Sequence, residues 1–258
     1  MIRRLLSHRP TSLLLGLSTF FVANALIAEC IGTKLFSLEK VFGRDPHPFS
    51  LLGQEGLTYT LTCGVLLWPL EFIMTDIVNE YFGPRVVRRI SYIAIALISY
   101  AFVMFFLAIN VPADRSFWTG SSASAGVPDM QLAFEAIFGQ GMWIILGSLT
   151  AFLVSQLLDA WIFHKVKKAT GGRWVWLRAT GSTLISQLVD SFIVLAIAFG
   201  KSWGPQRVLA IGLVNYSYKA VMALVLTPAI YLIEARIDAY LGKDTANTLK
   251  AAAAGEEE

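Results

Sequence analysis

Charged residues are scarce in this sequence. Only 15% of its 258 residues are Asp, Glu, Lys or Arg, whereas soluble domains carry roughly 25%. Hydrophobic residues make up 55% of the chain, and the mean hydropathy is +0.60. Together with long apolar runs, this composition excludes an ordinary soluble domain and indicates a protein that crosses the lipid bilayer several times. The net charge of +3 is too small to indicate a nucleic-acid partner.

The residues that build metal and catalytic centres are also few. Two cysteines, Cys30 and Cys63, do not make a disulfide framework, and whether they pair stays open. The three histidines, His8, His47 and His164, fall in predicted termini or loops rather than in metal-ligand spacing. P-loop, H-E-x-x-H and G-x-S-x-G motifs are absent from the sequence. The sequence therefore predicts no metal, no cofactor and no catalytic residue.

Apolar segments long enough to cross a bilayer, about 20 residues each, occur six times. They are predicted as helices over 11–36, 57–82, 90–111, 142–163, 181–200 and 207–233. The predicted fold class is all-α, with one six-helix transmembrane domain over 1–241 and a disordered cytoplasmic tail over 242–258. Three helices per half permit a 3+3 inverted repeat, although the two halves match weakly in sequence.

Lysine and arginine predict the orientation in the membrane. The two termini and loops 83–89 and 164–180 hold 14 of the 21 basic residues, and the alternate compartments hold five. Basic residues concentrate on the cytoplasmic side. Both termini are therefore predicted in the cytoplasm, which requires an even number of spans.

Polar groups lie inside the predicted spans, where charges are costly and usually face a cavity or a partner. The stretch S-T-L-I-S-Q-L-V-D-S (182–191) is too polar for an anchor, and S-Q-L-L-D (155–159) is similar to part of it. Six acids fall within the spans, opposed by two lysines: Glu29, Glu71, Asp76, Glu80, Asp159 and Asp190 against Lys34 and Lys219. The excess of acids predicts a polar chamber for a ligand that offers N–H donors, a cation or a proton.

Depth and helical spacing divide these polar residues into two predicted groups. The substrate-binding group is Asn24, Trp68, Glu71, Gln156, Gln187, Asp190 and Lys219. The gate or structural group is Lys34, Asp76, Asn79, Glu80 and Asp159, with the loop residues Arg85, Arg88 or Arg89 as partners of the gate acids. Pro69 is predicted to kink the second helix and to free a carbonyl group near Glu71. Alternatively, the Gln–Asp pairs only join the fourth and fifth helices, Trp68 only packs, and Lys219 is only a counter-charge.

Two long phrases carry a resemblance to a known family. F-I-M-T-D-I-V-N-E-Y-F-G (72–83) with the basic loop after it, and W-L-R-A-T-G-S-T-L-I-S-Q-L-V-D-S (176–191), resemble the bacterial vitamin uptake transporter family. Asn24 with Lys34 also fits that family's first-helix pattern, and the similarity covers roughly 13–235. One departure is that Ala179 and Thr180 stand where family members often have Asn.

The resemblance implies an importer in the bacterial inner membrane. Its substrate would be 7-cyano-7-deazaguanine (preQ0), with the aminomethyl derivative (preQ1) as a second candidate, for queuosine synthesis in tRNA modification. A guanine-like edge suits carboxylate and amide partners, and a planar ring stacks on an aromatic side chain. The alternatives are a vitamin-binding membrane protein that needs a separate energising module, an intramembrane enzyme, or a structural membrane partner. The energy coupling and the oligomeric state, including a homodimer, stay open.

Overall fold

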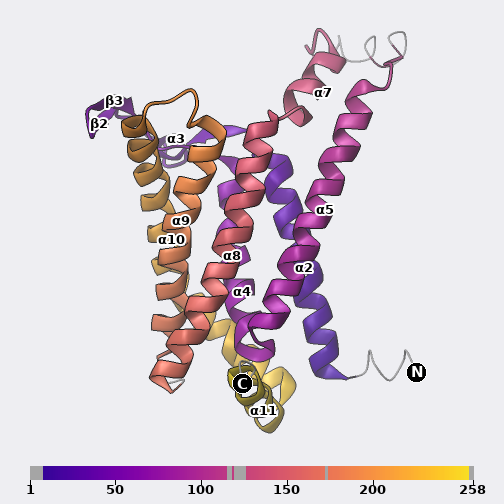
Figure 1. Cartoon of the computed structure of the whole chain (residues 1–258), viewed down its shortest axis with the longest axis vertical. Helices are drawn as coiled ribbons and strands as arrows, with labels where there is room; N and C mark the ends of the chain where they lie inside the picture. Colours follow the sequence, from indigo (N-terminus) through magenta and orange to yellow (C-terminus); the bar gives the residue numbers. More distant parts are fainter. Residues whose placement is uncertain (1–7, 115–117, 119–125, 172–173, 256–258) are drawn as a thin grey trace.

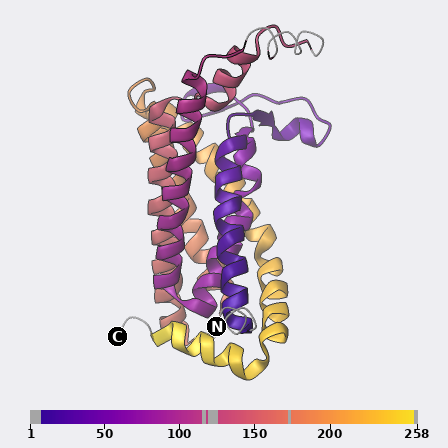
Figure 2. The same cartoon turned by 90° about the vertical axis from the view of Figure 1, so that its right-hand side faces the viewer.

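The computed structural model describes residues 8–114, 118, 126–171 and 174–255. Its long helices lie side by side along one axis (Figure 1). They are α2 (Arg9–Ile31), α4 (Trp68–Phe82), α5 (Pro84–Asn110), α8 (Met142–Thr170), α9 (Val175–Phe199) and α10 (Pro205–Leu241). The helix α11 (Lys243–Gly255) runs across one end of the bundle, where α2 also begins (Figure 2). The short helix α7 (Met130–Phe138) lies at the opposite end.

Five stretches of the described chain are long and apolar enough to cross a membrane. They are Arg9–Ile31, Pro84–Asn110, Met130–Thr170, Trp176–Phe199 and Pro205–Leu241. They match the predicted first, third, fourth, fifth and sixth spans. Helix α4 has 15 residues and reaches only about 22 Å at 1.5 Å per residue, short of the hydrocarbon thickness. A sixth crossing through α4 stays a prediction, as do the cytoplasmic termini and the inverted repeat.

The distribution of side chains is that of a membrane protein. Large apolar residues are exposed along the outer faces of α5 and α10, among them Tyr100, Phe106, Leu224 and Val225. Many of the buried side chains are instead polar or charged. Lipid tails can solvate the apolar outer faces, whereas polar groups must find partners inside the bundle.

Helix α4 is the central element. Ten of its 15 residues are buried. Its apolar residues contribute to two cores: Val78 packs with residues of α2, α5 and α8, and Ile73 and Ile77 pack with residues of α8 to α11. Four of its polar residues, Glu71, Asp76, Asn79 and Glu80, are also buried. A helix with most of its residues buried can present polar groups to several neighbours at once.

The predicted helix over 57–82 is wrong in its first half. Residues 35–62 form two small antiparallel pairs, β1 (Leu35–Ser37) with β4 (Thr60–Thr62) and β2 (Phe49–Leu51) with β3 (Gln54–Leu57). The short helix α3 (Leu38–Val41) lies between β1 and β2, and the 3-10 helix η1 (Cys63–Leu66) joins β4 to α4. Alternating Thr and Leu at 57–62 suit an extended chain.

The predicted disordered tail is also corrected, because residues 243–255 form helix α11. Ala246 and Ala253 are buried, and Ala246 belongs to the core that α4 shares with α10. The alanine-rich stretch, which has a high intrinsic helix propensity, therefore packs under the bundle. Residues 256–258 lie outside the described residues.

Candidate functional site

A cavity with about 450 Å³ of empty space lies between α4, α9 and α10. Its polar lining consists of Asp76, Thr180, Thr183, Gln187, Tyr218 and Lys219. Its apolar lining includes Trp68, Pro69, Phe72 and Met222. A mostly apolar cavity with a few convergent polar groups is typical of a small-molecule site.

Two side chains of the lining have hydrogen-bonding atoms without partners. Gln187 is 2% exposed, and neither its Nε2 nor its Oε1 makes a hydrogen bond to any described residue. Asp76 is likewise 2% exposed, and its Oδ1 has no such partner within the described ranges. Leaving a buried polar group unpaired costs about 1–3 kcal/mol. Gln187 and Asp76 therefore offer an amide and a carboxylate oxygen to a ligand.

An ion pair lies next to the cavity, and its acid, Asp190, comes three residues after Gln187 on α9. Lys219, which lines the cavity, pairs with Asp190 Oδ2. The Ser155 hydroxyl donates a hydrogen bond of 3.4 Å to Asp190 Oδ1. Lys219 and Asp190, both predicted in the substrate-binding group, are thus in contact. Their contact also agrees with the alternative of a simple counter-charge, so their part in binding stays a prediction.

Trp68 joins the cavity wall at the start of α4. Its ring is 5.5 Å from that of Phe152 and 6.4 Å from that of Phe72, both in tilted orientations. Pro69 is in the first turn of α4 and also lines the cavity. The predicted kink is therefore wrong, because the helix begins at Trp68 instead of continuing through the proline. Proline suits a helix start, where its missing N–H costs no bond.

The other predicted binding residues form a separate buried cluster between α2, α4 and α8. Asn24 Nδ2 donates to Glu71 Oε2 at 2.8 Å and to the Leu67 carbonyl at 3.1 Å. The Thr75 hydroxyl donates to Gln156 Oε1 at 2.7 Å. Glu71, Asn24 and Gln156 do not belong to the cavity lining of the described chain. They join the helices behind it.

A third group of polar contacts joins α8 and α9. The hydroxyls of Thr183 and Ser186 donate to Asp159 Oδ1 at 3.3 and 3.1 Å. Asp159 is fully buried, and its Oδ2 has no hydrogen-bond partner in the described part of the chain. The two polar phrases of the sequence thus meet, as the helix-joining alternative predicts.

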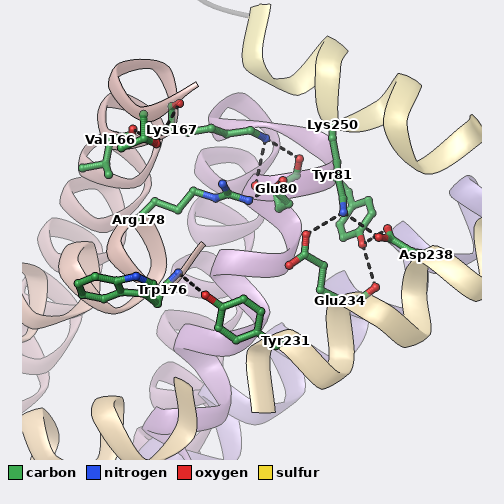
Figure 3. A network of polar contacts seen from close by, with 11 residues as sticks. Glu80, Tyr81, Val166, Lys167, Trp176, Arg178, Tyr231, Glu234, Asp238 and Lys250 are labelled. Atoms are coloured by element: carbon green, nitrogen blue, oxygen red, sulfur yellow. Dashed lines mark hydrogen bonds and ion pairs between the residues drawn. The ribbon is translucent and has the colours of Figure 1, made fainter. Parts of the chain in front are cut away.

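A fourth group of polar contacts is an ion-pair network at the α11 end of the bundle (Figure 3). Glu80 pairs with Lys167 Nζ at 3.1 Å and with Arg178 Nη2 at 2.9 Å. The Asn79 amide donates to the carbonyl of Ala160 at 3.0 Å. Among the described residues, the ion-pair partners of Glu80 are thus on α8 and α9, not the predicted Arg85, Arg88 or Arg89.

A neighbouring set of contacts attaches α11 to the bundle. Lys250 of α11 pairs with Glu234 at 2.7 Å and with Asp238 at 3.0 Å, both on α10. The Tyr81 hydroxyl of α4 donates to Asp238 at 2.6 Å. Burial lowers the pKa of Lys250, but its hydrogen bonds to the two carboxylates outweigh that effect, so the pKa is raised overall. Figure 3 shows both sets of contacts on the two sides of α4.

Lys34 lies apart from these groups of polar contacts. Helix α2 ends at Ile31, and the Lys34 side chain is exposed between α2 and β1. Its backbone carbonyl accepts a bond of 2.7 Å from the Cys63 N–H. Cys30 and Cys63 are both free. Within the part of the chain that the structure describes, no hydrogen bond or ion pair of the Lys34 side chain supports a gate role.

Sequence reasoning missed Lys167, Arg178 and Lys250 as parts of these networks. Hydropathy treats Lys167 and Arg178 as loop cations, because the fourth predicted span ends at 163 and the fifth begins at 181. Helices α8 and α9 in fact run on to Thr170 and from Val175. The missing signal was local: the sequence between 164 and 170 contains no Gly or Pro to end a helix.

A bundle of apolar helices around a cavity with a few convergent polar groups defines the class of this protein as a multi-pass membrane transporter. Residues 62–233 match the model of a family described as "Putative vitamin uptake transporter". A protein of Bacillus subtilis (strain 168), described as "Probable queuosine precursor transporter", is 33% identical over 178 residues, 68% of this chain and 72% of the relative. The chain belongs to the vitamin uptake transporter family. No solved structure matches it significantly.

Proposed function

We propose that the protein imports a queuosine precursor, 7-cyano-7-deazaguanine, across the bacterial inner membrane, with the aminomethyl derivative as a second substrate. The observation that carries the proposal is the pair of unsatisfied side chains in the cavity, Gln187 and Asp76. The name of the Bacillus relative supports the same substrate class.

The chemistry of the cavity suits a guanine-like edge. A carboxylate oxygen of Asp76 can accept from the ring N–H or the exocyclic amine, and the Gln187 amide can pair with a carbonyl and an N–H together. Trp68 offers an aromatic face to a planar ring. We assign Lys219 and Asp190 to the rim of the site, and Glu71 with Asn24 and Gln156 to the support behind it.

We infer an alternating-access cycle in which the Glu80 network is the cytoplasmic gate. Glu80 joins α4 to α8 and α9 at the α11 end, and α4, α9 and α10 also line the cavity. Opening the inner side would separate these helices and break the ion pairs. The assignment of the α11 end to the cytoplasm rests on the basic residues of the sequence.

Binding by the purified protein tests the substrate. We expect 7-cyano-7-deazaguanine, but not thiamine or biotin, to raise the melting temperature, because a ligand that binds the folded state at 100 times its Kd stabilises it by about 2.7 kcal/mol. Gln187→Ala should weaken binding on the order of 10- to 100-fold, the loss of about 1–3 kcal/mol. Gln206→Ala, at an exposed position at the start of α10, is the matched control. Absence of any shift with deazaguanines would refute the substrate.

Uptake in cells tests the mechanism. Cells that lack every energising module for vitamin-binding membrane proteins should still import the substrate when they express this chain alone. Uptake that appears only after such a module is added would favour the vitamin-binding alternative instead.

A further inference from the structure

Two buried carboxylates, Asp76 and Asp159, belong to the neighbouring helices α4 and α8. Thr75 bonds Gln156, and Asn79 bonds the carbonyl of Ala160, so the two helices advance together by four residues between these contacts. Asp76 comes one residue after Thr75, and Asp159 comes one residue before Ala160, so this register offsets the two acids by two residues, about 3 Å along the helix axis. The two acids interact electrostatically.

Each acid of this pair keeps one oxygen free of hydrogen bonds within the described chain, Oδ1 of Asp76 and Oδ2 of Asp159. Both side chains are at least 98% buried. The other oxygen of Asp159 accepts from the hydroxyls of Thr183 and Ser186. Hydroxyls orient a carboxyl group but supply no positive charge.

The charges around the pair leave one acid in excess. Asp76 also interacts with Arg178 of α9 and with Glu80 of its own helix, and Glu80 pairs with Arg178 and Lys167. Three carboxylates, those of Asp76, Asp159 and Glu80, therefore share the two cations Arg178 and Lys167. One bound proton makes the set neutral. Two carboxylates that interact in a low dielectric disfavour each other's ionisation, so one bound proton stabilises the set.

We propose that Asp76 and Asp159 form the coupling site of the transporter, where one exchangeable proton enters with each substrate molecule. This inference rests on the proposed import function. In the loaded state Asp159 carries the proton and Asp76 remains an acceptor for the substrate N–H groups, with Arg178 beside it. Both ligands can then be bound at once. When the Glu80 network opens, substrate leaves Asp76 and the proton leaves Asp159 toward the cytoplasm.

Transport in liposomes tests the coupling. With the membrane potential clamped at zero, one proton per substrate converts a gradient of one pH unit into about tenfold accumulation of a neutral substrate. An internal pH dye should report acidification when external 7-cyano-7-deazaguanine is added. We expect Asp159→Asn to keep substrate binding and exchange but to lose gradient-driven accumulation. Asp45→Asn, at an exposed loop position, should behave like the wild type. Accumulation by Asp159→Asn, or accumulation driven by sodium instead of protons, would overturn the proposal.

A substrate-independent measurement separates the two proposals. Infrared difference spectra of the purified protein between acid and alkaline pH should contain the C=O band of a protonated carboxyl group. Because other carboxyl groups also protonate in this range, the test is the component of the band that Asp159→Asn loses relative to the wild type and that Asp45→Asn and His164→Gln keep. If the band follows this pattern but no deazaguanine binds, the substrate assignment fails and the proton site stands. If Asp159→Asn loses no component of the band relative to the wild type, the proton site is refuted.

Discussion

Replacing Glu80 with glutamine should destabilise the protein more than any surface change. Glu80 is 6% exposed and pairs with Lys167 and Arg178, which are 6% and 2% exposed. Lys167 also donates to the Glu80 carbonyl at 2.9 Å, a bond that the substitution leaves intact. Glutamine keeps the shape of the side chain but leaves two buried cations near each other without their shared carboxylate.

The size of the effect follows from the burial of the pairs. Removing one partner of a buried ion pair costs about 3–5 kcal/mol because the remaining charge stays desolvated. Arg178 also interacts with Asp76, so part of its charge remains compensated and the lower bound applies, about 3 kcal/mol. Chains of about 150–250 residues change their melting temperature by about 2–4 °C per kcal/mol. The expected decrease is therefore about 6–12 °C.

Thermal unfolding in one detergent, followed by intrinsic fluorescence, measures this decrease. The matched control is Glu55→Gln, because Glu55 is exposed in β3 and exposed ion pairs contribute about 0–1 kcal/mol. A melting temperature for Glu80→Gln within the error of the Glu55→Gln value would refute the reasoning that this network holds α4 against α8 and α9.

Three further outcomes follow from individual contacts. The hydroxyl of Ser37 and the N–H of Tyr59 lower the pKa of Glu39. The stabilisation of the fold by Glu39 is therefore present above its unfolded-state pKa of about 4.5 and is lost as the pH falls through its folded-state pKa. NMR of the β1–β4 region should detect this loss in the wild type but not in Glu39→Gln. Gly64→Ala should lower the yield of folded protein in size-exclusion chromatography, because a Cβ there would lie 2.6 Å from the carbonyl oxygen of Ala28; retention of a wild-type profile would contradict this. Lys250→Ala should increase protease cleavage within α11, since both α10 carboxylates lose their cation, and unchanged protection would contradict the attachment.

The long apolar helices could be predicted from the sequence because the bilayer imposes their length and composition. Helices α2, α5, α8, α9 and α10 all have runs that satisfy this single constraint. The ends of the helices could not be predicted equally well, because beyond the hydrocarbon the constraint disappears. Lys167 and Arg178 lie in those extensions and pair inside the bundle. Hydropathy identifies such residues only as loop cations.

The candidate site was predicted in its residue types but not in its grouping. Gln187 was expected to bind substrate, and it lines the cavity with both amide atoms unpaired. Glu71 was expected beside it, but the Asn24 amide holds its carboxylate on the α2 side. Helical spacing indicates which residues share a face, whereas the partner across that face depends on packing. Asp76, expected at a gate, lines the cavity for the same reason.

Helix α9 contributes side chains to four groups of polar contacts, although none to the cluster of Asn24, Glu71 and Gln156. Arg178 binds Glu80, Thr183 binds Asp159, Gln187 lines the cavity, and Asp190 pairs with Lys219. The 12 residues from Arg178 to Asp190 span about 18 Å in a continuous helix. Since a helix moves as a stiff element, a shift of α9 that releases Arg178 also displaces Gln187 and Asp190. The Glu80 ion pairs at the α11 end and the Gln187 amide in the cavity are therefore mechanically linked through one helix.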